Sequence, residues 1–213
     1  MERIRFVVWY DYLCPWCYNG AVRLERLRDE FEGRRLRDEF EGRVELDWRC
    51  FLLRPADRGA RDPERFRAYT RSWLRPAEEA DAGSFRVWES DAPPPSHSVP
   101  PHRVARAAAE QGGFDAIHPR LLHAYFAENR DITDEDTLQT IWSEAGLPAE
   151  GFARAWQDDV LSSVLAEHDA ALEDGVTGVP AVRLAGNDAI IVGAQPLELY
   201  RRWAQRALDG RIL

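Results

Sequence analysis

The chain of 213 residues is long enough for one domain, or for one domain with a large insertion, and 45% hydrophobic residues can form a substantial core. Its formal net charge of −9 argues against nucleic acid or an anionic membrane surface as the partner, because both repel an acidic protein. No basic region precedes a long apolar run near the N-terminus, and no segment reaches the length of a membrane span, so we expect a cytoplasmic protein.

The first fifty residues are typical of a strand, a helix and a second strand. Apolar residues alternate with others over residues 4–8, which predicts a short and mostly buried strand. Proline is tolerated in the first turn of a helix, so we expect a helix near Pro15, with apolar residues at helical spacing over residues 22–31. Apolar and charged side chains alternate over residues 44–50, which predicts the second strand.

A tandem repeat interrupts this pattern. The nonapeptide RLRDEFEGR occupies residues 26–34 and is repeated at once over residues 35–43. Nine residues rotate a helix by roughly half a turn beyond two whole turns, so one unbroken helix would point the apolar residues of the two copies in opposite directions. Gly33 is a natural helix end. We therefore expect a break or excursion near Gly33, with a dimer contact built from the extra copy as the functional alternative.

The middle of the chain, about residues 62–174, has helical patterns and no convincing strand. Residues 90–102 (SDAPPPSHSVPPH) are so rich in proline that they predict an ordered loop rather than a helix. We expect Thr133 to cap one helix and Pro148 to start a turn before another. The clearest predicted helices cover residues 103–111, 116–128, 134–144 and 152–173.

The last segment returns to strands. GVPAVRLAG and AIIVGA predict two strands joined by a turn at Gly186 and Asn187, and an amphipathic helix is predicted over Leu197–Leu208. The element order predicts an α/β fold, a thioredoxin-like mixed sheet flanked by helices and interrupted by a large all-helical insertion. We expect residues 1–60 and 176–213 to form the thioredoxin-like domain and residues 61–175 the insertion domain.

The stretch DYLCPWCYNG contains Cys14 and Cys17 in a C-x-x-C arrangement, which can hold a metal, form a structural disulfide or exchange electrons. Stable structural disulfides are unusual in the cytoplasm, and three cysteines do not make a disulfide framework. Structural zinc needs four ligands, and Cys50 is the one further cysteine, so no metal site is predicted. Redox exchange is favoured, with an inert reduced pair as the alternative.

Position in the expected helix assigns different roles to the two cysteines. At a helix N-terminus the free backbone N–H groups and the helix dipole favour a thiolate at Cys14, and a thiolate is the nucleophile in disulfide exchange. Cys17 lies one turn later and is placed to resolve the mixed disulfide. Far downstream, a cis bond between Val179 and Pro180 would leave the Val179 backbone free to pair with an incoming strand. A trans proline at a strand start is the alternative.

Several motifs in order resemble the FrnE-like branch of the DsbA family of thiol–disulfide oxidoreductases. They are DYLCPWCYNG, GVPAV and GAQP, with SHSVPPHRVARAA, LLHAYFAENRDITD and EAGLPAEGF in the helical block. The resemblance covers nearly the whole chain and implies a thioredoxin-like domain with a helical insertion. It also implies that Cys14 is the nucleophile, Cys17 the resolving thiol and Pro180 a cis-proline that faces them.

The chain departs from that family in two places. The tandem repeat lengthens the region after the active-site helix, and Cys50 stands where family members commonly carry proline. Cys50 shares a strand face with Leu46 and Trp48, so we expect a buried core thiol. The alternative, a second redox partner, would require Cys50 to lie close to Cys14 or Cys17.

Four residues are expected to bind substrate. Pro15 and Trp16 lie inside the cysteine motif, where Trp16 is either a docking surface or a cover over the site. Because Trp16 stands in place of a histidine, we expect a pair less oxidising than the periplasmic DsbA enzymes. Val179 would offer its backbone, and the resemblance puts His97 over the active site, with an idle loop histidine as the alternative.

We therefore expect a cytoplasmic dithiol–disulfide oxidoreductase with a redox-active Cys14–Cys17 disulfide and neither a metal nor a bound organic cofactor. Its expected partners are protein or small-molecule thiols and disulfides, glutathione among them, and not nucleic acid or a membrane; a homodimer stays open. Two rival functions remain. One is that of glutathione-dependent 2-hydroxychromene-2-carboxylate isomerases, which share this fold but typically carry serine at the nucleophile position. The other is a non-catalytic chaperone or binding module, in which the cysteines would be dispensable.

Overall fold

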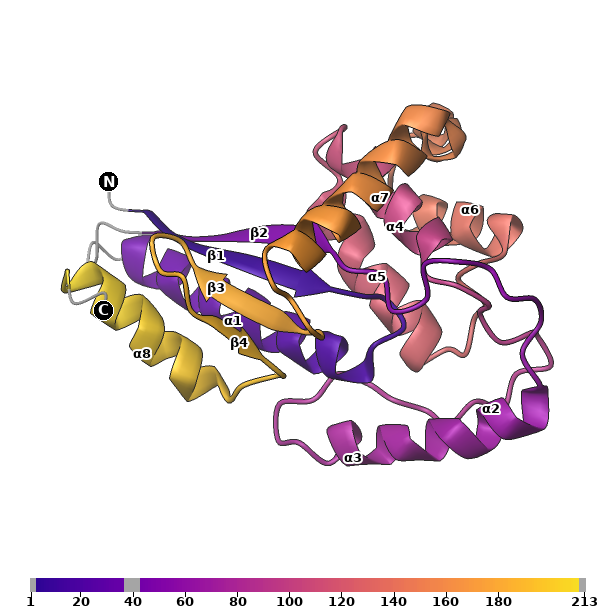
Figure 1. Ribbon diagram of the computed structural model, residues 1–213, viewed down its shortest axis with the longest axis horizontal. Helices are drawn as coiled ribbons and strands as arrows, with labels where there is room; N and C mark the ends of the chain where they lie inside the picture. The colour runs from indigo at the N-terminus through magenta and orange to yellow at the C-terminus, as the bar shows by residue number, and fades with distance from the viewer. Residues whose placement is uncertain (1–2, 37–42, 211–213) are drawn as a thin grey trace.

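The computed structural model describes residues 3–36 and 43–210 (Figure 1). Within these ranges four strands form one mixed sheet in the order β2-β1-β3-β4. Strand β1 runs parallel to β2, whereas β3 is antiparallel to both β1 and β4. The strands are β1 (Arg3–Tyr10), β2 (Arg43–Cys50), β3 (Ala181–Leu184) and β4 (Ile190–Val192). The predicted α/β class and thioredoxin-like mixed sheet are thereby confirmed.

Alternation along β1 gives the sheet two buried faces. Ile4, Phe6 and Val8 lie on the face covered by helices α1 (Pro15–Leu36) and α8 (Leu197–Leu208), which run along the same side of the sheet in Figure 1. Val7 and Trp9 point to the other face and pack near the end of helix α7. The boundaries predicted for α8 are confirmed.

Helix α1 corrects the prediction made from the tandem repeat. It continues through Gly33 to Leu36, so the expected break near Gly33 is wrong. A glycine inside a helix costs only about 1 kcal/mol relative to alanine. Leu27 and Phe31 of the first copy are buried against the sheet and α8, which holds the helix in place. Most of the second copy lies outside the described residues.

All the regular elements between Pro63 and Glu173, a stretch described without gaps, are helical. Many aromatic residues of this block share one apolar core with Cys14 and Cys17, so the insertion packs directly on the cysteine motif. The assignment of residues 61–175 to a separate domain stays a prediction. The elements are α2 (Pro63–Thr70), the 3-10 helix η1 (Arg71–Trp73), α3 (Leu74–Ala77), α4 (Val99–Ala109), α5 (Phe114–Phe126), α6 (Glu135–Glu144), the 3-10 helix η2 (Ala149–Trp156) and α7 (Asp158–Glu173).

Two predicted boundaries in this block are wrong for local reasons. Helix α4 begins at Val99, inside the expected loop, because Pro100 and Pro101 occupy the first helical turn, where a missing N–H costs nothing. The segment of residues 152–173 is not one helix: η2 ends at Trp156, and Gln157 has an extended backbone before α7 begins.

The cap of α6 also differs from the prediction. Asp134, rather than Thr133, caps this helix by accepting a hydrogen bond from the Thr137 N–H. The Thr133 hydroxyl instead donates to Asp131, two residues earlier. Asp and Thr are both good helix caps, so the sequence alone did not separate the neighbours.

Candidate active site

Cys14 immediately precedes helix α1, at the end of the turn that follows β1. Its backbone N–H donates to the Asp11 carbonyl at 3.2 Å, and the Leu13 N–H donates to the Asp11 carboxylate at 2.6 Å. The Cys17 N–H then donates to the Cys14 sulfur at 3.2 Å. This N–H of the first helical turn is shared between the Cys14 carbonyl, at 3.0 Å, and Cys14 Sγ, and a helix N-terminus stabilises negative charge through such N–H groups.

Val179 and Pro180 lie against this turn, although Val179 is 165 residues away from Cys14 in the chain. The peptide bond between them is cis, and the Cys14 thiol donates to the Val179 carbonyl oxygen at 3.4 Å. Pro180 also packs on α1, since a Cβ built on Gly20 would lie 3.3 Å from Pro180 Cγ. Glycine at position 20 thus lets the Val179–Pro180 segment approach the active-site helix closely.

Both sulfurs are buried. Cys14 is 4% exposed and Cys17 is 2% exposed, and each is a free thiol. Burial raises the pKa of Cys17 well above its usual value, and the adjacent Cys14 raises it further. At neutral pH the Cys17 sulfur is therefore protonated.

The other residues singled out in the sequence surround the pair to different degrees. Pro15, Trp16 and Val179 are half-buried, and both Trp16 and Val179 pack on the core that contains the cysteines. His97 instead bonds the neighbouring Ser96 hydroxyl through Nδ1 at 2.8 Å, and burial lowers its pKa. The described contacts of His97 include neither Cys14 nor Cys17, so the position of His97 over the active site stays a prediction.

Cys50 is 4% exposed, which confirms the predicted core thiol. It packs with Leu52, Val99 and Val164 in an apolar cluster separate from that of Cys14 and Cys17, and its N–H donates to Glu167 at 3.1 Å. Burial raises the pKa of its thiol. These contacts give no support to Cys50 as a second redox partner. Across residues 3–36 and 43–210, no group of three or more His, Cys, Asp or Glu side chains is gathered for metal binding.

Sequence reasoning missed the role of Asp11, a fully buried carboxylate beside the cysteine turn. Its oxygens accept from the Leu13 and Leu53 N–H groups and from the Ser98 hydroxyl. Burial raises the pKa of Asp11 to about 6, although these three hydrogen bonds oppose the shift. Its place at the start of the quoted stretch was the available signal, but an acidic residue after a strand is also an ordinary turn residue.

Replacing Asp11 with asparagine is expected to change the pH dependence of stability. Because the folded pKa is raised, the Asp11 contribution is complete below the usual pKa of 3.8 and is lost as the pH rises through about 6. The asparagine side chain does not titrate, so its loss of hydrogen bonds lowers the free energy of unfolding by the same amount at every pH. Relative to wild type, the free energy of unfolding of D11N should therefore rise by about 1 kcal/mol between pH 5 and pH 8. Urea unfolding at both pH values measures this, and a difference independent of pH would contradict it.

Residues 5–203 match the DSBA-like thioredoxin domain family, which is nearly the whole chain. The chain belongs to the DSBA-like thioredoxin domain family. This membership confirms the resemblance to DsbA-type proteins and, with both cysteines present, makes the chain a DsbA-like dithiol–disulfide oxidoreductase. The FrnE-like branch stays a prediction.

Several known proteins match most of the chain at low identity. The uncharacterized protein YwbO of Bacillus subtilis is 24% identical over 217 residues, covering 93% of this chain and 94% of its own. A probable DsbA oxidoreductase from Streptomyces coelicolor is 27% identical with a TM-score of 0.75, and 99% of this chain matches 92% of that one. The cytosolic disulfide reductase DsbM of Pseudomonas aeruginosa is 21% identical with a TM-score of 0.71, over 97% and 98% of the two chains. The last of these similarities supports the fold alone.

Proposed function

We propose that the chain exchanges electrons between its Cys14–Cys17 pair and the thiols or disulfides of proteins or small molecules, through a mixed disulfide at Cys14. This proposal rests on two contacts of Cys14 Sγ: the Cys17 N–H lies 3.2 Å from it and the Val179 carbonyl oxygen 3.4 Å from it. One contact stabilises charge on the sulfur, and the other supplies a backbone group beside which a substrate chain can align.

In the reducing direction, the Cys14 thiolate attacks a substrate disulfide. A bond forms between Cys14 Sγ and one substrate sulfur, the substrate S–S bond breaks, and the leaving thiolate takes up a proton. Cys17 then loses its proton and attacks Cys14 Sγ, which breaks the mixed disulfide and releases the second substrate thiol. The substrate gains two electrons and the pair becomes a Cys14–Cys17 disulfide. The oxidising direction is the reverse of these steps.

The unequal environments of the two cysteines support this order of attack. Cys14 Sγ accepts from the Cys17 N–H, whereas the raised pKa of Cys17 keeps that sulfur protonated until the mixed disulfide has formed. We assign substrate contact to the half-buried Pro15 and Trp16 and to the Val179 backbone, and we assign Pro180 to holding that backbone opposite Cys14. His97 is retained as a substrate-binding proposal because its loop also carries Ser98, which bonds Asp11.

Glutathione is our proposed small-molecule partner. The similar DsbM protein is a cytosolic disulfide reductase with a solved structure that contains GSH, whereas a similar thioredoxin-like protein from Salmonella is periplasmic. Among the described helices none is both long and apolar enough to cross a bilayer. We propose a cytoplasmic location, and protein thiols and disulfides as the other partners.

The reduction potential of the Cys14–Cys17 pair tests the proposed function. In glutathione buffers followed by tryptophan fluorescence, we expect a reversible two-electron transition at a potential below about −120 mV, the value for DsbA, because Trp16 supplies no imidazolium to favour the reduced thiolate. A Cys50→Ser variant should give the same potential. A pair that forms no reversible disulfide would refute the function, and a potential near that of DsbA would refute the role given to Trp16.

A further inference from the structure

Arg23 is a buried arginine on α1 whose contacts join three segments of the chain. Its side chain is 2% exposed. Its Nε donates to Asp81 at 2.8 Å and its Nη2 to Glu79 at 2.9 Å, both in the segment after α3. Its Nη1 donates to the carbonyl oxygens of Ala194 and Gln195, at 3.2 and 3.1 Å. The guanidinium fork thus holds the insertion and the loop before α8 against one helix.

The loop before α8 is in turn bonded to the segment that faces Cys14. The Gly193 N–H donates to the Pro180 carbonyl at 2.7 Å, and the Val179 carbonyl before it accepts from the Cys14 thiol. Pro180 rests on Gly20, one helical turn before Arg23. The Arg23 side chain is therefore connected to the backbone beside the reacting sulfur through two sets of hydrogen bonds and the covalent link between Gly193 and Ala194.

The insertion is also bonded to α1 on either side of the Arg23 contacts. One turn before Arg23, the Asn19 amide donates to the Pro76 carbonyl at 2.9 Å and accepts from the Gly83 N–H at 3.0 Å. Residues 76–83 are thus fixed to α1 at both ends, with the Arg23 contacts between, where the chain after α3 returns toward α1 (Figure 1). Arg23 thus contacts both the insertion and the loop that bonds Pro180.

We propose that Arg23 is a positioning residue for thiol–disulfide exchange: it fixes the Val179–Pro180 segment where a substrate chain pairs with it, using residues 79–81 of the insertion as its anchor. Only a planar fork can reach both carboxylates and both carbonyls together, so lysine at this position keeps the charge but loses part of the connection. This inference rests on the proposed reaction at Cys14, and it concerns how an extended substrate is aligned there.

The test compares two substrates in an Arg23→Lys variant. In both assays reduced glutathione returns the Cys14–Cys17 disulfide to the dithiol. One substrate is a disulfide-bonded peptide, which can pair through its backbone, and the other is hydroxyethyl disulfide, which has no peptide backbone. We expect KM for the peptide to rise about tenfold, the size expected for loss of one or two backbone hydrogen bonds, with kcat within about twofold of wild type. The kinetics with hydroxyethyl disulfide should be unchanged.

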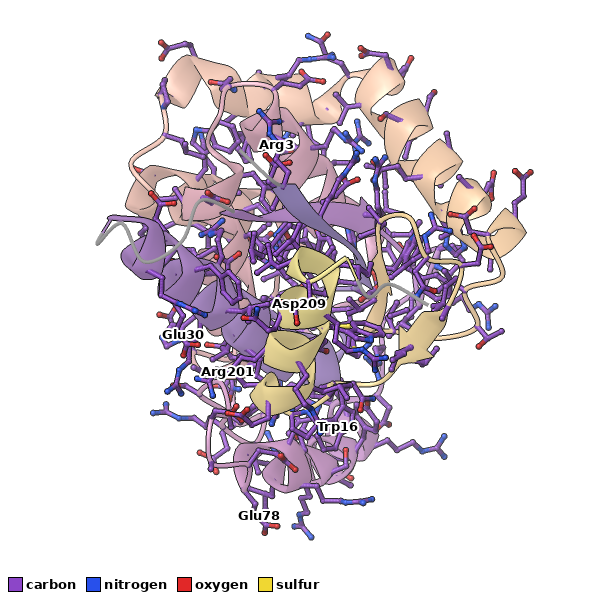
Figure 2. The ribbon with its side chains drawn as sticks, turned by 90° about the vertical axis from the view of Figure 1, so that its left-hand side faces the viewer. Arg3, Trp16, Glu30, Glu78, Arg201 and Asp209 are labelled. Carbon is purple, nitrogen blue, oxygen red and sulfur yellow. The ribbon has the colours of Figure 1, made fainter. Side chains whose placement is uncertain are left out.

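Arg201→Lys is the matched control. Arg201 of α8 points to Glu30 of α1 in Figure 2 and bonds it through Nε at 2.8 Å and Nη2 at 2.5 Å. It is also a forked arginine between α1 and the C-terminal part of the chain, but it has no described contact with the loop that holds Pro180. We expect Arg201→Lys to change the melting temperature without changing KM for either substrate.

Glu79→Gln tests the same proposal if the Arg23→Lys protein does not fold. Glu79 has a half-exposed side chain, so Glu79→Gln leaves Asp81 on the buried guanidinium and should raise the peptide KM about threefold, with hydroxyethyl disulfide unaffected. An unchanged peptide KM in these variants, or an equal loss for both substrates, would overturn the positioning role. A wild-type protein whose Cys14 forms no mixed disulfide with either substrate would instead refute the proposed function itself.

Discussion

Replacing Cys14 with serine is expected to lower the rate of thiol–disulfide exchange about a thousandfold or more, because a hydroxyl does not supply the nucleophile that forms the mixed disulfide. Replacing Cys17 with serine should have a different result. Cys14 would still attack, but the protonated thiol that completes the reaction would be missing. The Cys17→Ser protein should therefore accumulate as a mixed disulfide with its substrate.

Mass spectrometry of each variant after incubation with oxidised glutathione separates these outcomes. We expect a glutathione adduct on Cys17→Ser and none on Cys14→Ser, because burial raises the pKa of both remaining thiols, Cys17 and Cys50, and keeps them protonated. Cys50→Ser is the control, and it should turn over like wild type because Cys50 packs in another apolar cluster. Adduct formation at Cys17 in the Cys14→Ser protein would show that the assigned order of attack is wrong.

Stability is expected to fall steeply when the pH is lowered from 7 toward 4. His102 and His118 are buried beside the cysteine turn, and burial lowers the pKa of each to about 3. A lowered folded pKa gives a contribution that is complete above about 6.5 and is lost as the pH falls toward 3. At pH 4 each histidine therefore lowers the free energy of unfolding by about 3 kcal/mol relative to neutral pH. Asp11 offsets only part of this loss, because its raised pKa makes the protein more stable as the pH falls.

His118→Phe isolates one of the two contributions. The His118 ring stacks on Phe114 with centroids 4.9 Å apart, so a phenyl ring fits the same contact. The Tyr12 hydroxyl keeps its hydrogen bond from Tyr10 but loses the one to His118 Nδ1, at a cost that does not depend on pH. Urea unfolding at pH 7, 5.5 and 4.5 should show a clearly smaller loss of stability for this variant than for wild type. His123→Phe, which removes a 39% exposed side chain, is the control. Equal losses in wild type and His118→Phe would contradict the assignment.

The elements that sequence reasoning predicted well are those whose signals are local. Alternation gave β1 and β2, the turn at Gly186 and Asn187 separated β3 from β4, and α8 has the predicted boundaries. The continuous α1 was missed because packing of its first half on the sheet outweighs a weak local stop at Gly33. The proline-rich segment predicts a loop, but two of its prolines fit the first turn of α4, so the helix begins earlier than predicted.

The candidate site divides in the same way. The cysteine motif and Val179–Pro180 could be predicted because their local sequence has a direct chemical meaning. Asp11 and Arg23 could not, because their importance comes from burial and from partners far along the chain, such as Ser98 for the carboxylate and Gln195 for the guanidinium. A charged residue is usually solvated, so sequence gives no reason to expect either one inside the protein.

The order of the strands has a consequence for synthesis on the ribosome. Strand β1 lies between β2, which follows it closely, and β3, which begins at Ala181. A nascent chain that has emerged only as far as α7 therefore has one edge of β1 without its native neighbour, and Cys14 without the Val179 carbonyl. Helix α8 is also missing from the face of Phe6 at that stage. Cys14 is thus synthesised before its Val179 partner, which can reach it only after all the helices of the insertion have been made.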